Sequence, residues 1–138
     1  MTSETVLTVR YAETDMMGVV HHSNYAIWFE VARTELFKNL GSSYADIEKQ
    51  GILLPLTGLQ CEFKKPARYG DEVVVKTTIE KLTCVRLEFG YEVCCRGSGQ
   101  LLATGKTMHA WTDASFKPLN TEKKMPELYK LVSQGAVY

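Results

Sequence analysis

The sequence predicts an α+β domain in which an antiparallel sheet of about five strands wraps around one long central helix. Three observations support this class. A strongly apolar helical pattern lies early in the chain, segments with an apolar period of two follow it, and glycine-containing turns separate some of these segments. The 138 residues suit one domain, 1–138, because a chain of this length buries a substantial core without metals or disulfides.

The long helix is expected between residues 23 and 40. Its apolar side chains recur at spacings of three and four, as on one face of a helix. They are Tyr25, Trp28, Phe29, Ala32, Leu36 and Leu40. Ser23 or Asn24 can cap the start, because a short oxygen-bearing side chain accepts from the free N–H groups of the first turn. Gly41 suits a left-handed C-cap. Further apolar residues widen this face, so we expect protein to surround the helix.

Strands are expected before and after this helix in the sequence. Alternating apolar side chains predict them at 6–11, 59–64, 73–80, 85–96 and 101–112. Gly97-Ser98-Gly99 predicts a hairpin turn between the last two, because glycine adopts positive φ at little cost. A short helix is expected at 43–50 and a weaker one from Pro126, which the first turn of a helix tolerates. This order is typical of an antiparallel sheet with a helix on one face.

Charge and cysteine usage narrow the classes of function. The 16 basic residues balance the 16 acidic ones, so no basic field indicates a nucleic-acid or membrane partner. The four cysteines lack the C-x-x-C spacing of zinc sites. Neither a signal peptide nor an apolar run long enough to span a membrane is present. We therefore expect a cytoplasmic protein without a bound metal.

The segment between the first strand and the long helix holds the candidate catalytic group. Asp15 lies in a glycine-containing loop, seven residues before His22. His22 adjoins the start of the helix, where unpaired N–H groups and the positive dipole end can polarise a carbonyl and hold an oxyanion. A carboxylate beside an oxyanion site supplies two parts of a hydrolase. Taken alone, Asp15 can equally be a residue that closes its loop.

Three stretches resemble the 4-hydroxybenzoyl-CoA thioesterase family. Residues 10–25, RYAETDMMGVVHHSNY, are similar to its active-site signature. Residues 28–35, WFEVARTE, resemble its helix, and residues 63–71, FKKPARYGD, resemble its strand-and-turn segment. The resemblance extends in order over nearly the whole chain. It implies the hotdog fold and an acyl-CoA thioesterase that releases a free acid and CoA.

The resemblance also implies roles for individual residues. Asp15 matches the catalytic aspartate of the family, which would act as nucleophile or as general base on water. His22 matches the position whose backbone N–H faces the thioester carbonyl. Gly18, Val20 and Tyr25 are expected to line the substrate site.

The CoA portion belongs to the substrate, so no separate cofactor is implied. Its phosphates need basic partners, and Lys65, Arg68 and Arg86 are the candidates, with Lys117 as a further one. Each of these, taken singly, can equally be a solvated surface charge. The resemblance implies that two protomers pair to form sites at their interface, so we expect a homodimer or a homotetramer.

Three alternatives remain open at this point. Another active-site style of the family places a glutamate on the central helix after His-Gly-Gly, but the chain lacks that tripeptide, and Glu30 and Glu35 are typical of a polar helix face. A non-catalytic acyl-thioester-binding protein would not need the loop carboxylate. A hotdog dehydratase or hydratase uses a different histidine-containing motif. The loop aspartate is therefore the preferred catalytic group.

Overall fold

Five antiparallel strands form one sheet in the computed structural model, which describes residues 2–136. The strands are β1 (Thr2–Thr8), β2 (Leu56–Phe63), β3 (Glu72–Leu82), β4 (Arg86–Cys95) and β5 (Leu101–Ala110). Their order across the sheet is β1-β3-β4-β5-β2, so β1 and β2 are the two edges. The α+β class and the sheet of about five antiparallel strands are confirmed.

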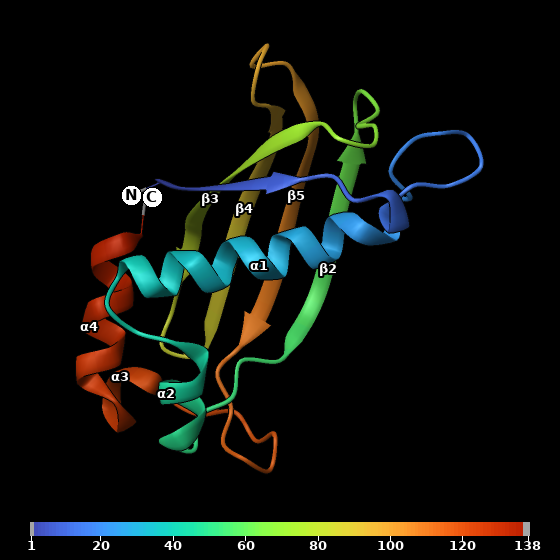
Figure 1. Ribbon diagram of the computed structural model, residues 1–138. Coiled ribbons are helices and arrows are strands. Elements are labelled where there is room, and N and C mark those ends of the chain that lie inside the picture. Colours follow the sequence, from blue (N-terminus) through green and yellow to red (C-terminus); the bar gives the residue numbers. More distant parts are fainter. Residues whose placement is uncertain (1, 137–138) are drawn as a thin grey trace.

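Four α-helices accompany the sheet within residues 2–136. They are α1 (Ser23–Asn39), α2 (Tyr44–Lys49), α3 (Thr121–Lys124) and α4 (Pro126–Gly135). The longest, α1, lies across one face of the sheet, and α4 lies near the C-terminal end of α1 (Figure 1). In this part of the chain, no helix combines the length and apolar character needed to cross a membrane.

The core lies between α1 and the sheet. Along α1, the side chains of Phe29, Ala32, Leu36 and Phe37 are fully buried. Phe29 stacks on Tyr91 of β4, with ring centroids 4.3 Å apart and planes inclined by 13°. Each large apolar side chain buried in this way contributes about 1.5–3 kcal/mol. The sheet therefore fixes the position of α1 firmly.

The first strand begins and ends earlier than the predicted 6–11. β1 pairs with β3 from Thr2 opposite Thr78 to Thr8 opposite Glu72, which is the first residue of β3. Beyond Thr8 no partner strand remains, and the chain turns into a short 3₁₀ helix (Tyr11–Glu13). The start was missed because buried positions of β1 carry the polar residues Ser3 and Thr5.

The start of α1 also differs from the prediction. Neither Ser23 nor Asn24 caps the helix; His22 occupies the N-cap position without a side-chain hydrogen bond. The Ser23 hydroxyl is paired with Nδ1 of His21 at 2.8 Å, and the Asn24 amide donates to the Glu13 carbonyl at 2.9 Å. Both side chains hold the preceding loop and are therefore unavailable to the helix. At the other end, Gly41 has a φ of +93°, as its predicted C-cap role requires.

Gly105 is the glycine that the close approach of α1 requires. A Cβ at this position of β5 would overlap the Phe29 ring, which has no room to move because Tyr91 stacks on its face. Gly105→Ala is therefore expected to lower the free energy of unfolding by about 1–3 kcal/mol, measured by urea denaturation. Gly97→Ala is the matched control: a Cβ there meets nothing within 4 Å, and we expect a change below about 0.5 kcal/mol. Equal stability of the two variants would contradict this packing.

Candidate active site

A pocket of about 310 Å³ lies where the loop before α1 meets the end of β2. Two separate segments of the chain form it. Its lining residues are Asp15, Met17, Val19, Val20, His22, Tyr25, Phe63, Lys64, Lys65 and Pro66. The stretches 10–25 and 63–71, which resemble the same family, therefore meet in space.

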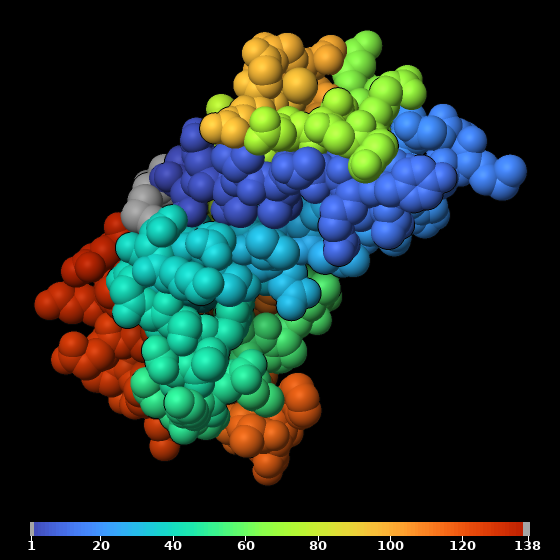
Figure 2. Space-filling model, viewed as in Figure 1, coloured from blue at the N-terminus to red at the C-terminus, as the bar shows by residue number. Residues whose placement is uncertain are grey.

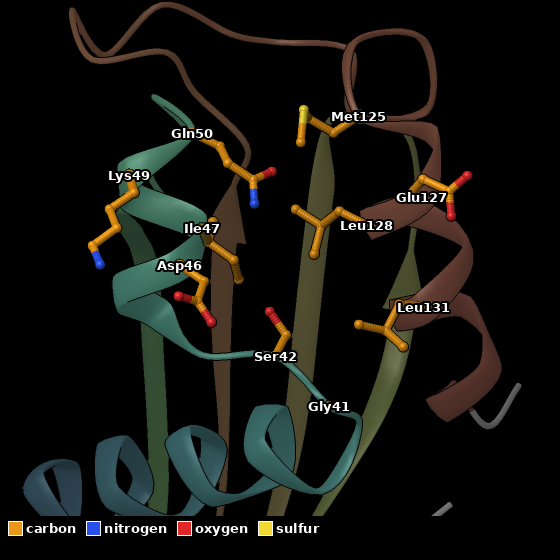
Figure 3. Close-up of a pocket in the computed structure, with 10 residues that line it drawn as sticks. All are labelled: Gly41, Ser42, Asp46, Ile47, Lys49, Gln50, Met125, Glu127, Leu128 and Leu131. Atoms are coloured by element: carbon orange, nitrogen blue, oxygen red, sulfur yellow. The ribbon is translucent and has the colours of Figure 1, made fainter.

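A larger cavity lies elsewhere and has a different character. It measures about 480 Å³ and lies between α2 and α4, where Ile47 and Leu128 face one another (Figure 3). None of the predicted site residues lines it. Its charged residues, such as Asp46 and Glu127, are exposed at the surface. The smaller pocket is therefore the better candidate for an active site.

Glu13 anchors the loop that carries the site. The whole residue is only 4% exposed. The carboxylate accepts hydrogen bonds from the Arg10 backbone N–H and from Nε1 of Trp28, both at 2.8 Å. Its carbonyl accepts from the His21 N–H at 2.8 Å and from the Asn24 amide at 2.9 Å. One residue thereby ties the 3₁₀ helix to both the start and the interior of α1.

Burial raises the pKa of the Glu13 carboxyl, but its hydrogen bonds with Arg10 and Trp28 and the nearby Arg10 guanidinium together bring this pKa below its usual value. The charged form is thus the one that the fold accommodates. Buried carboxylates are tolerated when such partners replace their water.

The loop after Glu13 protrudes from the body of the molecule (Figures 1 and 2). It is closed at its base by a bridge between Thr14 and Val20 and by the Asp15 N–H, which donates to the Val19 carbonyl at 2.9 Å. Gly18, predicted to line the site, has a φ of +78° and makes the reversal of the loop instead. It is not among the lining residues of the pocket.

The Asp15 carboxylate combines the two roles that the sequence left open. Oδ1 accepts from the Met17 N–H at 2.8 Å, so the side chain does close its loop. Within residues 2–136, Oδ2 makes no hydrogen bond and no ion pair. Asp15 also lines the pocket and is partly exposed. One oxygen therefore holds the orientation of the group while the other can meet a ligand.

His22 supplies the one unpaired N–H group at the start of α1. The His21 N–H donates to the Glu13 carbonyl, the Ser23 N–H approaches Nδ1 of His21 at 3.2 Å, and the Asn24 N–H donates to the His21 carbonyl. The His22 N–H has no acceptor among the residues that the structure describes. It adjoins the positive end of the helix dipole, so it can receive a developing oxyanion.

Aromatic rings form the apolar wall of the pocket. Tyr25 is buried, and its ring lies 4.8 Å from that of Trp28 and 5.1 Å from that of Phe63. Burial, with Cys61 nearby, raises the pKa of Tyr25 above its usual value. The ring lines the pocket together with that of Phe63.

The predicted basic residues occupy three different places. Lys65 lines the pocket and makes no ion pair with any residue in 2–136, whereas Lys64, which was not predicted, lines it and pairs with Glu62 at 2.9 Å. Arg68 is exposed three residues beyond Lys65 and does not line the pocket. Arg86 lies at the opposite end of the sheet: it is opposite Ala110 of β5, whereas Phe63 is opposite Ala103.

Several lining residues were not predicted. They are Met17, Val19, Phe63, Lys64 and Pro66. From the stretch 63–71, the sequence predicts only the phosphate ligands Lys65 and Arg68. Phe63 is 53% exposed at the end of β2. Its place in the wall of the pocket follows only from the position of β2 beside the start of α1.

The lowered pKa of Glu13 predicts a dependence of stability on pH. A carboxyl with a depressed pKa in the folded state stabilises the fold above about pH 4.3, the usual value for glutamate, and this contribution disappears as the pH falls through the folded pKa. The free energy of unfolding of the wild type is therefore expected to fall more steeply below about pH 4.3 than that of Glu13→Gln. Urea denaturation between pH 3 and pH 7 measures both. Parallel curves would show that Glu13 does not carry this effect.

Proteins with similar sequences carry thioesterase names. The family model described as the thioesterase-like superfamily matches residues 9–128. A Bacillus subtilis protein with the provisional name acyl-CoA thioesterase YneP is 41% identical over 126 residues, which are 91% of each chain.

Solved structures are similar over nearly the whole chain. A DHNA-CoA thioesterase from Staphylococcus aureus has a TM-score of 0.92 at 42% identity, covering 96% of this chain and 89% of that chain. A 1,4-dihydroxy-2-naphthoyl-CoA thioesterase from Synechocystis has a TM-score of 0.85 at 25% identity, covering 96% of each chain. The chain therefore belongs to the thioesterase-like superfamily and has its hotdog fold.

Proposed function

We propose that the protein is a thioester hydrolase that converts an acyl-CoA to a free acid and CoA. One observation carries this proposal. Asp15 has a fixed carboxylate with one free oxygen, and His22 has the only unpaired N–H at the start of α1 among the described residues. Both residues line the same pocket. The thioesterase names of the relatives support the same reaction.

The reaction needs a place for the carbonyl oxygen and a group that brings oxygen to the carbonyl carbon. The His22 N–H, at the positive end of α1, would stabilise the negative charge that develops on the carbonyl oxygen. Asp15 would either attack the carbon, giving a mixed anhydride that water then hydrolyses, or take a proton from an attacking water. In both cases the C–S bond breaks, the CoA sulfur leaves as a thiolate that is then protonated, and water supplies the new acid oxygen.

The two ends of the substrate would meet different walls. The acyl group would lie against Tyr25, Phe63 and Val20, which are apolar. Lys65, which lines the pocket, is the best placed partner for a CoA phosphate. Arg68, nearby in sequence, could extend this contact, whereas Arg86 could serve only a site formed with another protomer.

Within the superfamily we assign the chain to the loop-aspartate style of the 4-hydroxybenzoyl-CoA thioesterase family. The helix glutamates lie away from the pocket. Glu30 lines a different depression with Arg33, and Glu35 pairs with Lys38 at 3.3 Å. Neither is therefore placed to replace Asp15.

The cytoplasm is the compartment we propose for this reaction. All four cysteines, Cys61, Cys84, Cys94 and Cys95, are free thiols. Thiols persist in a reducing compartment, whereas secreted proteins of this size commonly form disulfides. The acyl-CoA substrate would be hydrolysed there without a separate cofactor.

Asp15→Asn tests the reaction directly. The amide oxygen can still accept from Met17, so the loop is expected to stay closed, while the reacting carboxylate is lost. We expect the rate of thiol release from a panel of aliphatic and aromatic acyl-CoAs to fall about 10²- to 10⁴-fold. His22→Ala should lose less, because its backbone N–H remains.

Asp113→Asn is the matched control for this experiment. Asp113 also closes a turn, since its Oδ1 accepts from the N–H groups of Ser115 and Lys117, but it does not line the pocket. This variant should keep the wild-type rate. Full activity of Asp15→Asn would sink the assignment, and a His22→Ala loss as large as that of Asp15→Asn would give the imidazole a chemical role.

We also propose that the protein is a homodimer, alone or doubled into a homotetramer. β2 is an edge strand and exposes Leu56, Leu59 and Phe63, and α1 exposes Ile27 and Val31. Unpaired edges with apolar side chains favour association. Sedimentation velocity at micromolar concentration should give at least twice the chain mass, and Leu59→Lys should lower it. A monomeric wild type would refute this assembly.

A further inference from the structure

Glu13 is a buried charged group that the proposed chemistry does not use. We propose that Glu13 is a positioning residue, which holds the Asp15 carboxylate and the His22 N–H in their reactive arrangement through its four accepted hydrogen bonds. This inference rests on the proposed thioester hydrolysis. It assigns to Glu13 an effect on turnover that exceeds its effect on stability.

The carboxylate fixes where the loop begins. It joins the Arg10 backbone, at the end of the first strand region, to the Trp28 side chain, which lies 3% exposed in the interior of α1. Asp15 follows only two residues later, and the bridge between Thr14 and Val20 transmits the position of Glu13 to the base of its loop. A shift of Glu13 relative to α1 would therefore move Asp15 relative to the helix start.

The carbonyl of Glu13 fixes where the oxyanion donor points. It accepts from the His21 N–H and from the Asn24 amide. The His21 carbonyl in turn accepts from the N–H of Asn24 at 3.1 Å and from its side-chain amide at 3.2 Å. Because a trans peptide is planar, this carbonyl sets the opposite direction for the His22 N–H in the same peptide unit. Both reacting groups thus depend on Glu13.

The charge state of Glu13 matters as well as its size. Both carboxylate oxygens face N–H donors, those of Arg10 and Trp28. A glutamine of equal length would have to present its NH₂ group to one of them, leaving a donor facing a donor. An alanine would leave both donors without a partner. The loss of turnover is therefore expected to be larger in Glu13→Ala than in Glu13→Gln.

Steady-state kinetics on an acyl-CoA that the wild type hydrolyses provide the first test. We expect kcat to fall about 10-fold in Glu13→Gln and about 100-fold in Glu13→Ala, since displacements near 1 Å cost this much. KM should stay within about 2-fold, because the apolar wall of the pocket is unchanged. Val132→Ala serves as the control: Val132 is buried in α4, remote from the pocket, so its loss lowers stability but should leave kcat unchanged.

The indole N–H signals of the two tryptophans provide a readout that does not depend on activity. Trp28 donates to Glu13, whereas Nε1 of Trp111 is buried without a partner among the described residues. In proton NMR, Glu13→Gln should shift the Trp28 signal and leave the Trp111 signal in place. Trp28→Phe assigns the two signals and, by removing one of the partners of Glu13, should also lower kcat.

The outcomes separate the two proposals. If the wild type hydrolyses acyl-CoA and Asp15→Asn does not, while Glu13→Ala matches Val132→Ala in kcat at similar stability, the positioning role is overturned and the proposed function stands. If the wild type releases no thiol from any acyl-CoA, the function falls and the positioning role falls with it. A selective loss of kcat together with the Trp28 shift supports the role.

Discussion

A buried charge has to be compensated by fixed partners, and the pairing of the Glu13 carboxylate with Trp28 and Arg10 is the constraint on which the candidate site depends. Burial of an unpaired carboxylate costs several kcal/mol. The fold can therefore accommodate Glu13 only where the 3₁₀ helix lies against α1. The cost of breaking this arrangement keeps the loop in one register, although the tip of that loop is open to solvent.

The sheet supplies the second half of the pocket through its strand order. β2 follows α1 and α2 in sequence but pairs at the far edge with β5. Its end at Phe63 is continued by Lys64 and Lys65, whose N–H groups both donate to the Leu102 carbonyl at 2.8 and 3.0 Å. The Val20 N–H then donates to the Ala67 carbonyl at 2.9 Å. Val20 and Ala67, which are 47 residues apart in the sequence, are thereby joined by a backbone hydrogen bond.

Local signals in the sequence were sufficient for the features that depend on local physics. The apolar period and Gly41 located α1. Asp15, His22 and Tyr25 came from the resemblance of residues 10–25 to a family and not from local physics. The structure places them around one pocket, and their roles stay predictions. The roles of side chains that depend on tertiary contacts were not predictable in this way. Ser23 or Asn24 was expected to cap α1, because no local pattern reveals that the His21 ring and the Glu13 carbonyl bind these two side chains. Arg86 was grouped with Lys65 because sequence gives no strand order.

Asp15 is held at the base of a protruding loop, which is what the proposed hydrolysis requires of its carboxylate. Exposed residues such as Met16 occupy the tip, whereas the base is closed by the Thr14–Val20 bridge and anchored by Glu13. Using one oxygen of Asp15 to bind the Met17 N–H removes much of the rotational freedom of its carboxylate before any substrate arrives. Preorganisation of this kind lowers the entropic cost of reaching the transition state. The rigidity that the site requires is therefore confined to the base of the loop, and the tip stays free to contact a substrate or a second protomer.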